Sequence, residues 1–337
     1  MRGSSAIVLL LIAASTFGAQ VALVPTEKAP AAAVDPRQWL ADMSEAFNTL
    51  SYDGVFSYFS GSDLASLRIV HMMVDGEQRE RLIHQNGAPR EIVRRGEEVV
   101  CILMPGDDLL TLESNLLAGP FARAFVRRYD EISEFYSLTF YGEDRIAGRS
   151  AVRLAVTPLD QDRFGYRLWL DRETRLLLKS ELIDGEGQPL EIFQFSSLII
   201  GDAVDAASLE PVGERETPHI TNMSLDSQPA IPVAETVRWN AGWLPVGFTL
   251  AGSNVRKTMS DEKSINTLMF SDGLAAFSVF IEDMPPAGAA SVVTRSGATV
   301  AVTHLTPGPG DKQHLVTLVG ELPTATALRI ASSIRFQ

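Results

Sequence analysis

The residues of this chain that could do chemistry are few and scattered. Five histidines stand at positions 71, 84, 219, 304 and 314, and none forms a His-Glu-x-x-His pattern or lies at metal-ligand spacing from a cysteine. Gly308-Pro-Gly-Asp-Lys lacks the spacing and the Ser or Thr of a phosphate-binding loop. No Gly-x-Ser-x-Gly segment is present, and no pair of carboxylates stands out from the turn and surface positions. These patterns predict no metal, no cofactor and no enzymatic activity.

The single cysteine and one histidine lie within predicted strands. Cys101 sits in Val-Val-Cys-Ile-Leu-Met, where a small buried side chain is expected, since nothing nearby in the sequence would lower the pKa of its thiol. His71 stands between Val70 and Met72, which favours a structural histidine over a ligand. Because a single cysteine cannot form a disulfide bond within the chain, the fold must be stabilised by its apolar cores.

Aromatic residues near the C-terminal third suggest binding rather than catalysis. Trp239 and Trp243 lie four residues apart in a segment interrupted by Gly242 and Pro245. They are either core residues of a small domain or anchors of a protein interface, because tryptophan is enriched at binding hot spots. We single out Trp243 and Phe248 as candidate partner-binding residues.

Charge and the N-terminus limit the partners. The chain of 337 residues has a net charge of −13, all of it in the first 230 residues, because the remainder has eight basic and eight acidic residues. Such a surface disfavours nucleic acid and anionic membranes. Residues 1–22 resemble a secretory signal peptide, with Arg2 followed by a short apolar run. We therefore expect the protein to be exported. An Ala- and Pro-rich leader follows the signal peptide in the sequence.

The elements that would position any site begin with a helix and a strand meander. Asp35-Pro36 predicts a helix start, and an apolar stripe follows at three- and four-residue spacing. Between Tyr52 and Met104, five short apolar or alternating runs are separated by Gly61-Ser62-Asp63, Asp75-Gly76, Asn86-Gly87 and Arg95-Gly96. Asp-Gly and Asn-Gly favour tight hairpin turns, so this region predicts an antiparallel meander.

A second meander of five strands is predicted between Leu138 and Leu198, after a possible short helix at 121–129. Ten strands and two helical segments predict an α+β fold with one large, curved antiparallel sheet covered by helices, over residues 35–210. Such a sheet can leave an apolar hollow, although a one-residue error in register would invert every inward choice. The candidate lining residues are Trp39, Met43, Phe47, Phe56, Ile69, Leu82, Val99, Leu168 and Phe193.

A smaller unit is predicted at the C-terminal end. Residues 211–230 are rich in Pro, Gly, Ser, Thr and Asn and predict a linker. Residues 231–337 then predict a small α+β domain, with strands at 264–270, 274–281, 298–303 and 313–319 and a final helix after Pro323.

Several segments in order resemble one family. They include Trp39-Leu-x-x-Met, Tyr52-Asp-Gly-Val-Phe, Arg79-Glu-Arg-Leu, Arg90-Glu-Ile-Val-Arg and Trp243-Leu-Pro-Val-Gly-Phe. Asp171-Arg-Glu-Thr-Arg-Leu-Leu-Leu-Lys and His71 belong to the same set. Together they resemble the RseB/MucB family of periplasmic sigma-factor regulators. The match covers nearly all of the chain that follows the signal peptide and leader.

The resemblance implies a large domain similar to the lipoprotein carriers LolA and LolB, which is an open half-barrel, and a smaller regulatory domain. It implies a periplasmic protein that binds the periplasmic part of a membrane anti-sigma factor and shields it from proteolysis. Lipid, lipopolysaccharide or lipoprotein acyl chains would relieve this shielding. The alternative is a periplasmic carrier of lipid or lipoprotein, and the sequence leaves a homo-oligomer open.

Overall fold

The computed structural model describes residues 35–96, 98–103, 132–211, 219–224, 238–257, 264–283, 290–309 and 312–337. The predicted signal peptide and the helix predicted at 121–129 lie outside these residues. Within the described part of the chain, no helix has the length and apolar character needed to cross a lipid bilayer.

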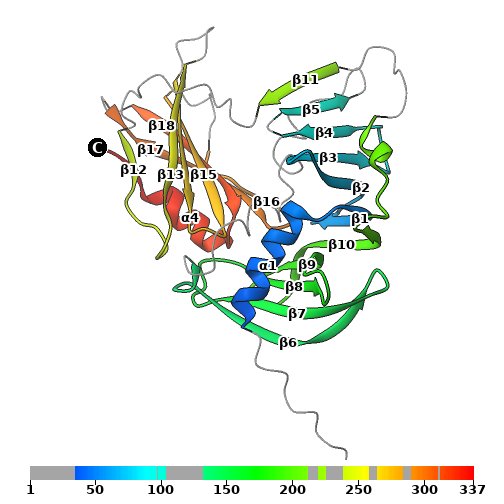
Figure 1. Ribbon diagram of the computed structural model, residues 1–337. Helices are drawn as coiled ribbons and strands as arrows, with labels where there is room; N and C mark the ends of the chain where they lie inside the picture. The colour runs from blue at the N-terminus through cyan, green and yellow to red at the C-terminus, as the bar shows by residue number, and fades with distance from the viewer. Residues whose placement is uncertain are drawn as a thin grey trace, which may run out of the picture. The chain divides into compact units, whose positions relative to one another are not determined.

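An antiparallel sheet of eleven strands forms the larger part of the described chain (Figure 1). Its first meander comprises β1 (Tyr52–Ser60), β2 (Asp63–Val74), β3 (Glu77–His84), β4 (Glu91–Arg95) and β5 (Glu98–Leu103). Its second comprises β6 (Tyr136–Ile146), β7 (Arg149–Pro158), β8 (Gly165–Asp171), β9 (Leu177–Ile183) and β10 (Pro189–Ile200). The strand order is β11-β5-β4-β3-β2-β1-β10-β9-β8-β7-β6, so the sheet is open, with β11 and β6 at its edges.

The pairing of β1 with β10 joins the two meanders. Tyr52 lies opposite Ile200 at one end of this ladder, and Ser60 lies opposite Glu191 at the other. The turns agree with the sequence prediction: Asp75 and Gly76 both have positive φ, as a type I′ turn requires. The predicted curved antiparallel sheet is therefore confirmed.

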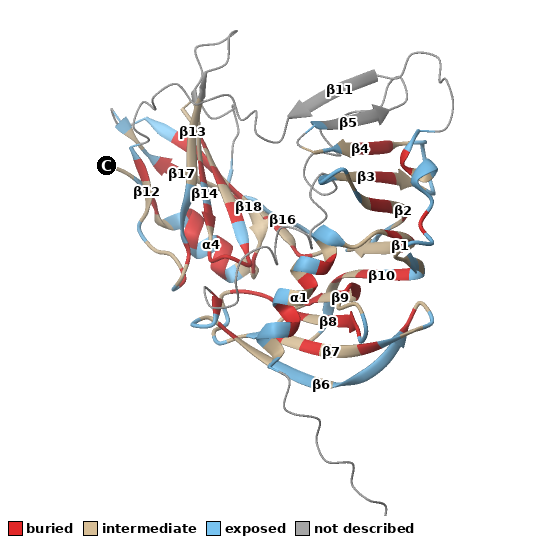
Figure 2. Cartoon of the chain, in the orientation of Figure 1, coloured by how far each residue is buried: buried red, intermediate tan, exposed pale blue. Residues whose placement is uncertain are grey.

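Helix α1 (Pro36–Thr49) begins as predicted. The Asp35 side chain accepts a hydrogen bond from the Arg37 amide at 3.0 Å, and Pro36 occupies the first turn. The helix buries Trp39, Leu40, Met43 and Ala46, which lie on one stripe. Trp39, Leu40 and Met43 of this stripe pack in one cluster with side chains of the large sheet, and Figure 2 shows buried positions along α1.

The opposite face of the first meander is closed by a short 3-10 helix, η2 (Ala206–Leu209). Val70, Val204 and Leu209 form a small apolar cluster there. The buried Arg81 pairs with Glu91 at 2.8 Å and donates to the carbonyls of Ser208 and Glu210. A buried charge needs such compensation. The third strand, β3, in which Arg79, Glu80 and Arg81 are adjacent, thus contributes to a covered ion pair.

A second sheet of six strands forms the core of the C-terminal domain. It comprises β13 (Thr249–Lys257), β14 (Ser264–Ser271), β15 (Ala276–Glu282), β16 (Val293–Ser296), β17 (Thr299–Pro307) and β18 (Gln313–Glu321). Helix α4 (Thr324–Ser333) packs on β17 and β18, while β12 (Trp239–Ala241) pairs with β19 (Ile334–Phe336). A smaller α+β domain was predicted, and this part of the fold is also confirmed.

Besides the strands β12, β13, β16 and β19, which were not predicted, two stretches differ from the sequence prediction. β11 (His219–Ser224) lies inside the segment predicted as a linker and pairs with β5, with Thr221 opposite Cys101. Its sequence, His-Ile-Thr-Asn-Met-Ser, has too little apolar alternation to indicate a strand, and an available sheet edge supplies the hydrogen bonds. In addition, Leu274 was assigned to a strand but lies in the turn before β15.

Candidate functional site

The apolar face of the large sheet and the buried stripe of α1 form one core, which we call the apolar cluster. Opposed residues in the strand registers place its members on a common face: Phe56 lies opposite Leu67, Ile69 opposite Leu82, and Leu168 opposite Leu154. Six of the predicted lining residues are buried in it: Trp39, Met43, Phe56, Leu82, Leu168 and Phe193. Phe47 and Ile69 are partly buried against it. Val99 lies on β5, for which the backbone alone is described.

Three phenylalanines occupy the centre of this face. Phe56 lies 4.8 Å from Phe193 and 5.8 Å from Phe195, measured between ring centroids. Gly54, two residues before Phe56, has no side chain because a Cβ there would lie 2.6 Å from the Phe195 ring. The Tyr-Asp-Gly-Val-Phe segment therefore needs its glycine for the close approach of β1 to an aromatic ring on β10.

Helix α1 is fixed over this face by a cation–π contact. The Arg175 guanidinium lies 3.8 Å from the centre of the Trp39 ring and 3.6 Å from the Asp42 carboxylate. The Trp39 ring in turn meets Phe140 edge-on, at 5.9 Å. Arg175 follows the turn after β8, so a residue far from the helix in sequence holds it in place.

Polar atoms are embedded in this apolar region. His71 stacks on Tyr52 at 4.8 Å, and its Nδ1–H donates to the Leu50 carbonyl at 2.8 Å. Burial lowers the pKa of His71, so its imidazole is neutral at pH 7. Trp39 Nε1, His71 Nε2 and Ser180 Oγ are among the buried side-chain atoms that have no hydrogen-bond partner within the described residues.

Two turns of the small sheet reach the apolar cluster. Leu274, in the β14–β15 turn, is 6% exposed, and Ala298, in the β16–β17 turn, is fully buried. Both pack in the apolar cluster of the large sheet rather than in the core of their own domain. Ala275, next to Leu274, belongs to the small-domain core. The two domains thus share apolar packing at these turns.

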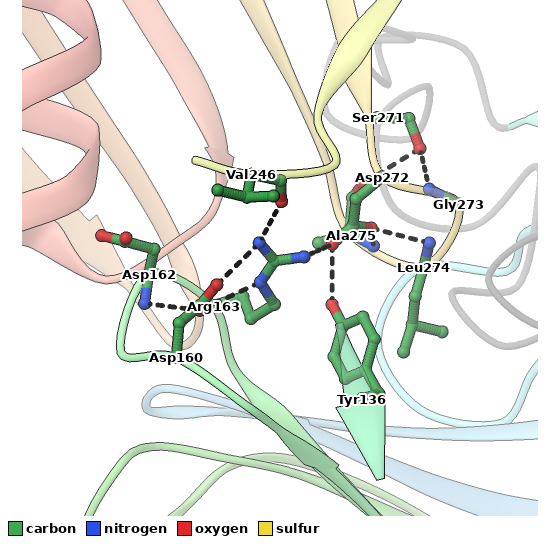
Figure 3. Close-up of polar contacts among 10 residues, drawn as sticks. All are labelled: Tyr136, Asp160, Asp162, Arg163, Val246, Ser271, Asp272, Gly273, Leu274 and Ala275. Carbon is green, nitrogen blue, oxygen red and sulfur yellow. Dashed lines mark hydrogen bonds and ion pairs between the residues drawn. The ribbon is translucent and has the colours of Figure 1, made fainter. Parts of the chain in front are cut away.

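Arg163 provides the main polar link between the domains (Figure 3). It lies in the β7–β8 loop, and its guanidinium donates to Asp272 at 2.5 Å, to the Val246 carbonyl at 2.6 Å and to both Asp160 oxygens. The side chains of Arg163 and Asp272 are both fully buried. Tyr136 also donates to Asp272, at 3.0 Å.

Asp272 orders the turn that carries Leu274. Its second oxygen accepts from the amides of Leu274 at 2.9 Å and Ala275 at 2.7 Å, as Figure 3 shows for Leu274. One carboxylate therefore neutralises Arg163 and shapes the turn beside it. Burial opposes the charge on Arg163, but the hydrogen bonds to Asp160 and the nearby Tyr136 and Asp272 raise its pKa. Burial, followed by the charge of Asp272, raises the pKa of Tyr136, which remains a donor.

A second polar contact lies at the β16–β17 turn. The buried Glu191 carboxylate accepts from Tyr58 at 2.6 Å, from Ser60 at 3.1 Å and from the Ala298 amide at 3.4 Å. Gly297 has a φ of +57°, and a Cβ there would lie 2.3 Å from Ser60 Oγ. Only glycine allows this close approach.

The two predicted partner-binding residues occupy different positions. Phe248 is 5% exposed, lies 5.4 Å from Phe277 and belongs to the small-domain core. Trp243 is half-buried at the edge of that core, with the Arg329 guanidinium 3.7 Å from its ring centre. Between them, Val246 is 76% exposed. Among the described residues, no group of three His, Cys, Asp or Glu side chains could hold a metal ion.

Comparison with known families decides the identity of the fold. The model of the MucB/RseB N-terminal domain matches residues 35–213, and that of the MucB/RseB C-terminal domain matches residues 233–335. The chain belongs to the MucB/RseB family. It is 38% identical over 309 residues to the sigma factor AlgU regulatory protein MucB of Pseudomonas aeruginosa, with 90% of this chain and 92% of the relative covered.

A more distant MucB/RseB relative and two solved structures agree. The sigma-E factor regulatory protein RseB of Escherichia coli is 28% identical, over 88% of this chain and 89% of the relative. The crystal structure of MucB in complex with MucA(peri) is 36% identical, with a TM-score of 0.72 and coverage of 90% and 99%. A second MucA/MucB complex, from Pseudomonas aeruginosa, is 35% identical with a TM-score of 0.73 and the same coverage. These named relatives are regulatory proteins.

The sequence analysis of this MucB/RseB protein did not predict which residues link its two domains. Arg163 and Asp272 are 109 residues apart, and each stands in an ordinary turn sequence. The one local signal was Asp272-Gly273, which indicated a turn without indicating its partner. Glu191 likewise stands in an alternating strand, where a carboxylate is expected on a solvated face.

We predict that Arg163→Lys lowers the free energy of unfolding by about 3 kcal/mol, because one ammonium cannot satisfy Asp160, Asp272 and the Val246 carbonyl together. Urea unfolding followed by tryptophan fluorescence measures this. The matched control is Arg167→Lys, whose partially exposed side chain pairs with Glu181 and should cost less than about 1 kcal/mol. Equal losses for the two variants would contradict the central role of Arg163.

The second prediction concerns pH. Burial, and then the charge of Glu191, raise the pKa of Glu321 from its ordinary 4.5 to about 7. The folded chain therefore binds more protons than the unfolded chain between pH 4.5 and 7, and stability falls as pH rises through this window. Glu321→Gln should remove that fall and stabilise the protein at pH 8 by roughly 1–3 kcal/mol.

Urea unfolding at pH 5, 6, 7 and 8 tests this prediction. The control is Glu282→Gln, which changes a half-buried residue on β15 of the same sheet. It should keep the pH dependence of the wild-type protein. An unchanged slope between pH 5 and 7 in Glu321→Gln would show that another group is responsible.

Proposed function

We propose that this protein restrains a sigma factor by binding the periplasmic part of a membrane anti-sigma factor and shielding it from proteolysis. The observation that carries the proposal is the match of both family models, in order, together with the similarity to MucB in complex with MucA(peri). Because those structures cover 90% of this chain, the proposal rests on both domains.

The contacts between the domains support a regulator over a carrier. A carrier needs only the large sheet and its apolar face. Here the small domain is attached through a fully buried ion pair, Arg163 with Asp272, and through Glu191. Burying such charges is energetically costly, so their retention suggests that the arrangement they specify is used. A fixed orientation of two sheets provides a composite surface for a protein partner.

The apolar cluster supports lipid as the relieving signal. An acyl chain gains about 0.8 kcal/mol per buried methylene, so roughly a dozen methylenes offer about 10 kcal/mol before any costs. The face that would take it combines the rings of Phe56, Phe193 and Phe195 with aliphatic side chains. Lipid would act here as a signal that weakens partner binding.

We further propose that the protein acts in the periplasm and without catalysis. The signal-like segment at residues 1–22 supports export. The buried charged groups Arg163, Asp272 and Glu191 each make a hydrogen bond to the other domain, and they are not arranged as nucleophile and base. Binding therefore accounts for their arrangement better than chemistry does.

Titration calorimetry tests the function directly. The full mature chain is titrated with the periplasmic part of the anti-sigma factor from the same organism, and we expect a one-to-one complex with a Kd in the micromolar range or below. A protease-protection assay on that anti-sigma segment provides the second measurement. No binding at 100 μM protein, or binding without protection, would reject the proposal.

We predict different outcomes for the two aromatic candidates. Trp243→Ala, at the edge of the small-domain core, should weaken partner binding by about thirtyfold while changing the melting temperature little. Phe248→Ala should lower the melting temperature, since truncating a buried phenylalanine costs about 3–5 kcal/mol. Loss of stability without loss of affinity in Trp243→Ala would make Trp243 a packing residue instead.

A further inference from the structure

The apolar cluster of the large sheet is completed by residues that belong to the small domain. Leu274 and Ala298 come from two separate turns, after β14 and before β17, and both are buried among large-sheet residues. Leu274 has no place in the core of its own domain, although Ala275 beside it does. A leucine at the tip of a hairpin turn would ordinarily be exposed, so its burial reflects docking onto a surface outside its domain.

Both turns are held by contacts that depend on docking. The Asp272 carboxylate that shapes the Leu274 turn also accepts from Arg163 and Tyr136 of the large domain. The Ala298 amide donates to Glu191, and the adjacent Gly297 packs on Ser60. Separation of the domains would break these bonds and expose Leu274, Ala298 and the apolar side chains beneath them.

The same face retains unused hydrogen-bonding capacity. Trp39 Nε1 and Ser180 Oγ are buried donors without a partner among the described residues. Ser180 lies opposite Phe193 and opposite Leu168, so the strand registers place it on the face of the apolar cluster. A ligand that carries a carbonyl group beside an aliphatic chain would suit both the apolar side chains and these donors.

We propose that the acyl chain of a membrane lipid and the Leu274 and Ala298 turns are alternative occupants of the apolar cluster. Lipid then binds when the small domain undocks, and its binding holds the domains apart. A lipid fits better than a lipidated protein, because it brings no protein portion that would need a surface of its own beside the cluster. This inference deepens the proposed function. It rests on that function for one consequence, namely that undocking of the small domain releases the anti-sigma partner.

The test uses the full mature chain and palmitoyl lysophosphatidylethanolamine as the probe, kept below its critical micelle concentration and without any partner. Leu274→Ser should tighten the apparent Kd for the probe about tenfold, since it weakens the competing occupant and raises the binding-competent fraction. Leu328→Ser, which changes an exposed leucine on α4, is the matched control and should leave the Kd unchanged.

Hydrogen–deuterium exchange provides an independent measurement on the wild-type protein. The probe should accelerate exchange in peptides that contain the Ala298 amide, which donates to Glu191, and in those that contain Leu274 and Ala275. Gly297→Ala offers a second route to undocking, because its Cβ would meet Ser60 Oγ, and it should also tighten probe binding. This variant keeps the test informative if Leu274→Ser folds poorly.

Equal or weaker probe binding in both variants, or unchanged exchange at the two turns, would overturn the competition. A palmitoylated cysteine peptide serves as a second probe. If the variants bound this peptide more tightly but did not bind the lipid more tightly, the choice of lipid as the ligand would be overturned. Because these measurements contain no anti-sigma segment, their failure is distinct from failure of the proposed function, which the calorimetric titration decides.

Discussion

A buried arginine must have all of its charge and most of its donors compensated, and Arg163 imposes this constraint on both domains. Its compensation comes from Asp160 in its own loop and from Asp272 and the Val246 carbonyl in the small domain. Removal of any of these groups would leave uncompensated charge in a buried site. The position of the β14–β15 turn, and with it that of Leu274, follows from this requirement.

The large sheet supplies the surface on which that turn packs. Pairing of β1 with β10 unites two local meanders, and the rings of Phe56, Phe193 and Phe195 meet across this seam. Near the same seam, Glu191 faces the small domain, where Glu321 is destabilised in its charged form. The junction therefore combines a buried ion pair, Arg163 with Asp272, and a carboxyl group, Glu321, whose pKa is raised by burial and then by the charge of Glu191.

Much of the fold was predictable from local patterns. The capped start of α1, the Asp75-Gly76 turn and the ten strands of the two meanders each follow from a few adjacent residues. β13, with the sequence Thr-Leu-Ala-Gly-Ser-Asn-Val-Arg-Lys, lacks alternation and was missed, as were β11, β12, β16 and β19. These strands are short or polar, and pairing with a neighbouring strand stabilises them more than their own composition does.

The sequence by itself determined the secondary-structure periodicity, the tight turns, the absence of familiar catalytic motifs and the resemblance to one regulatory family. These properties depend on residue type and short spacing. The tertiary structure alone decided that Arg163 meets Asp272, that Phe248 is buried while Trp243 is half-buried, and that Leu274 packs in a domain other than its own. The contact of Arg163 with Asp272 joins residues 109 positions apart. The energy of these contacts comes from desolvation and charge compensation, which exist only once the chain has folded.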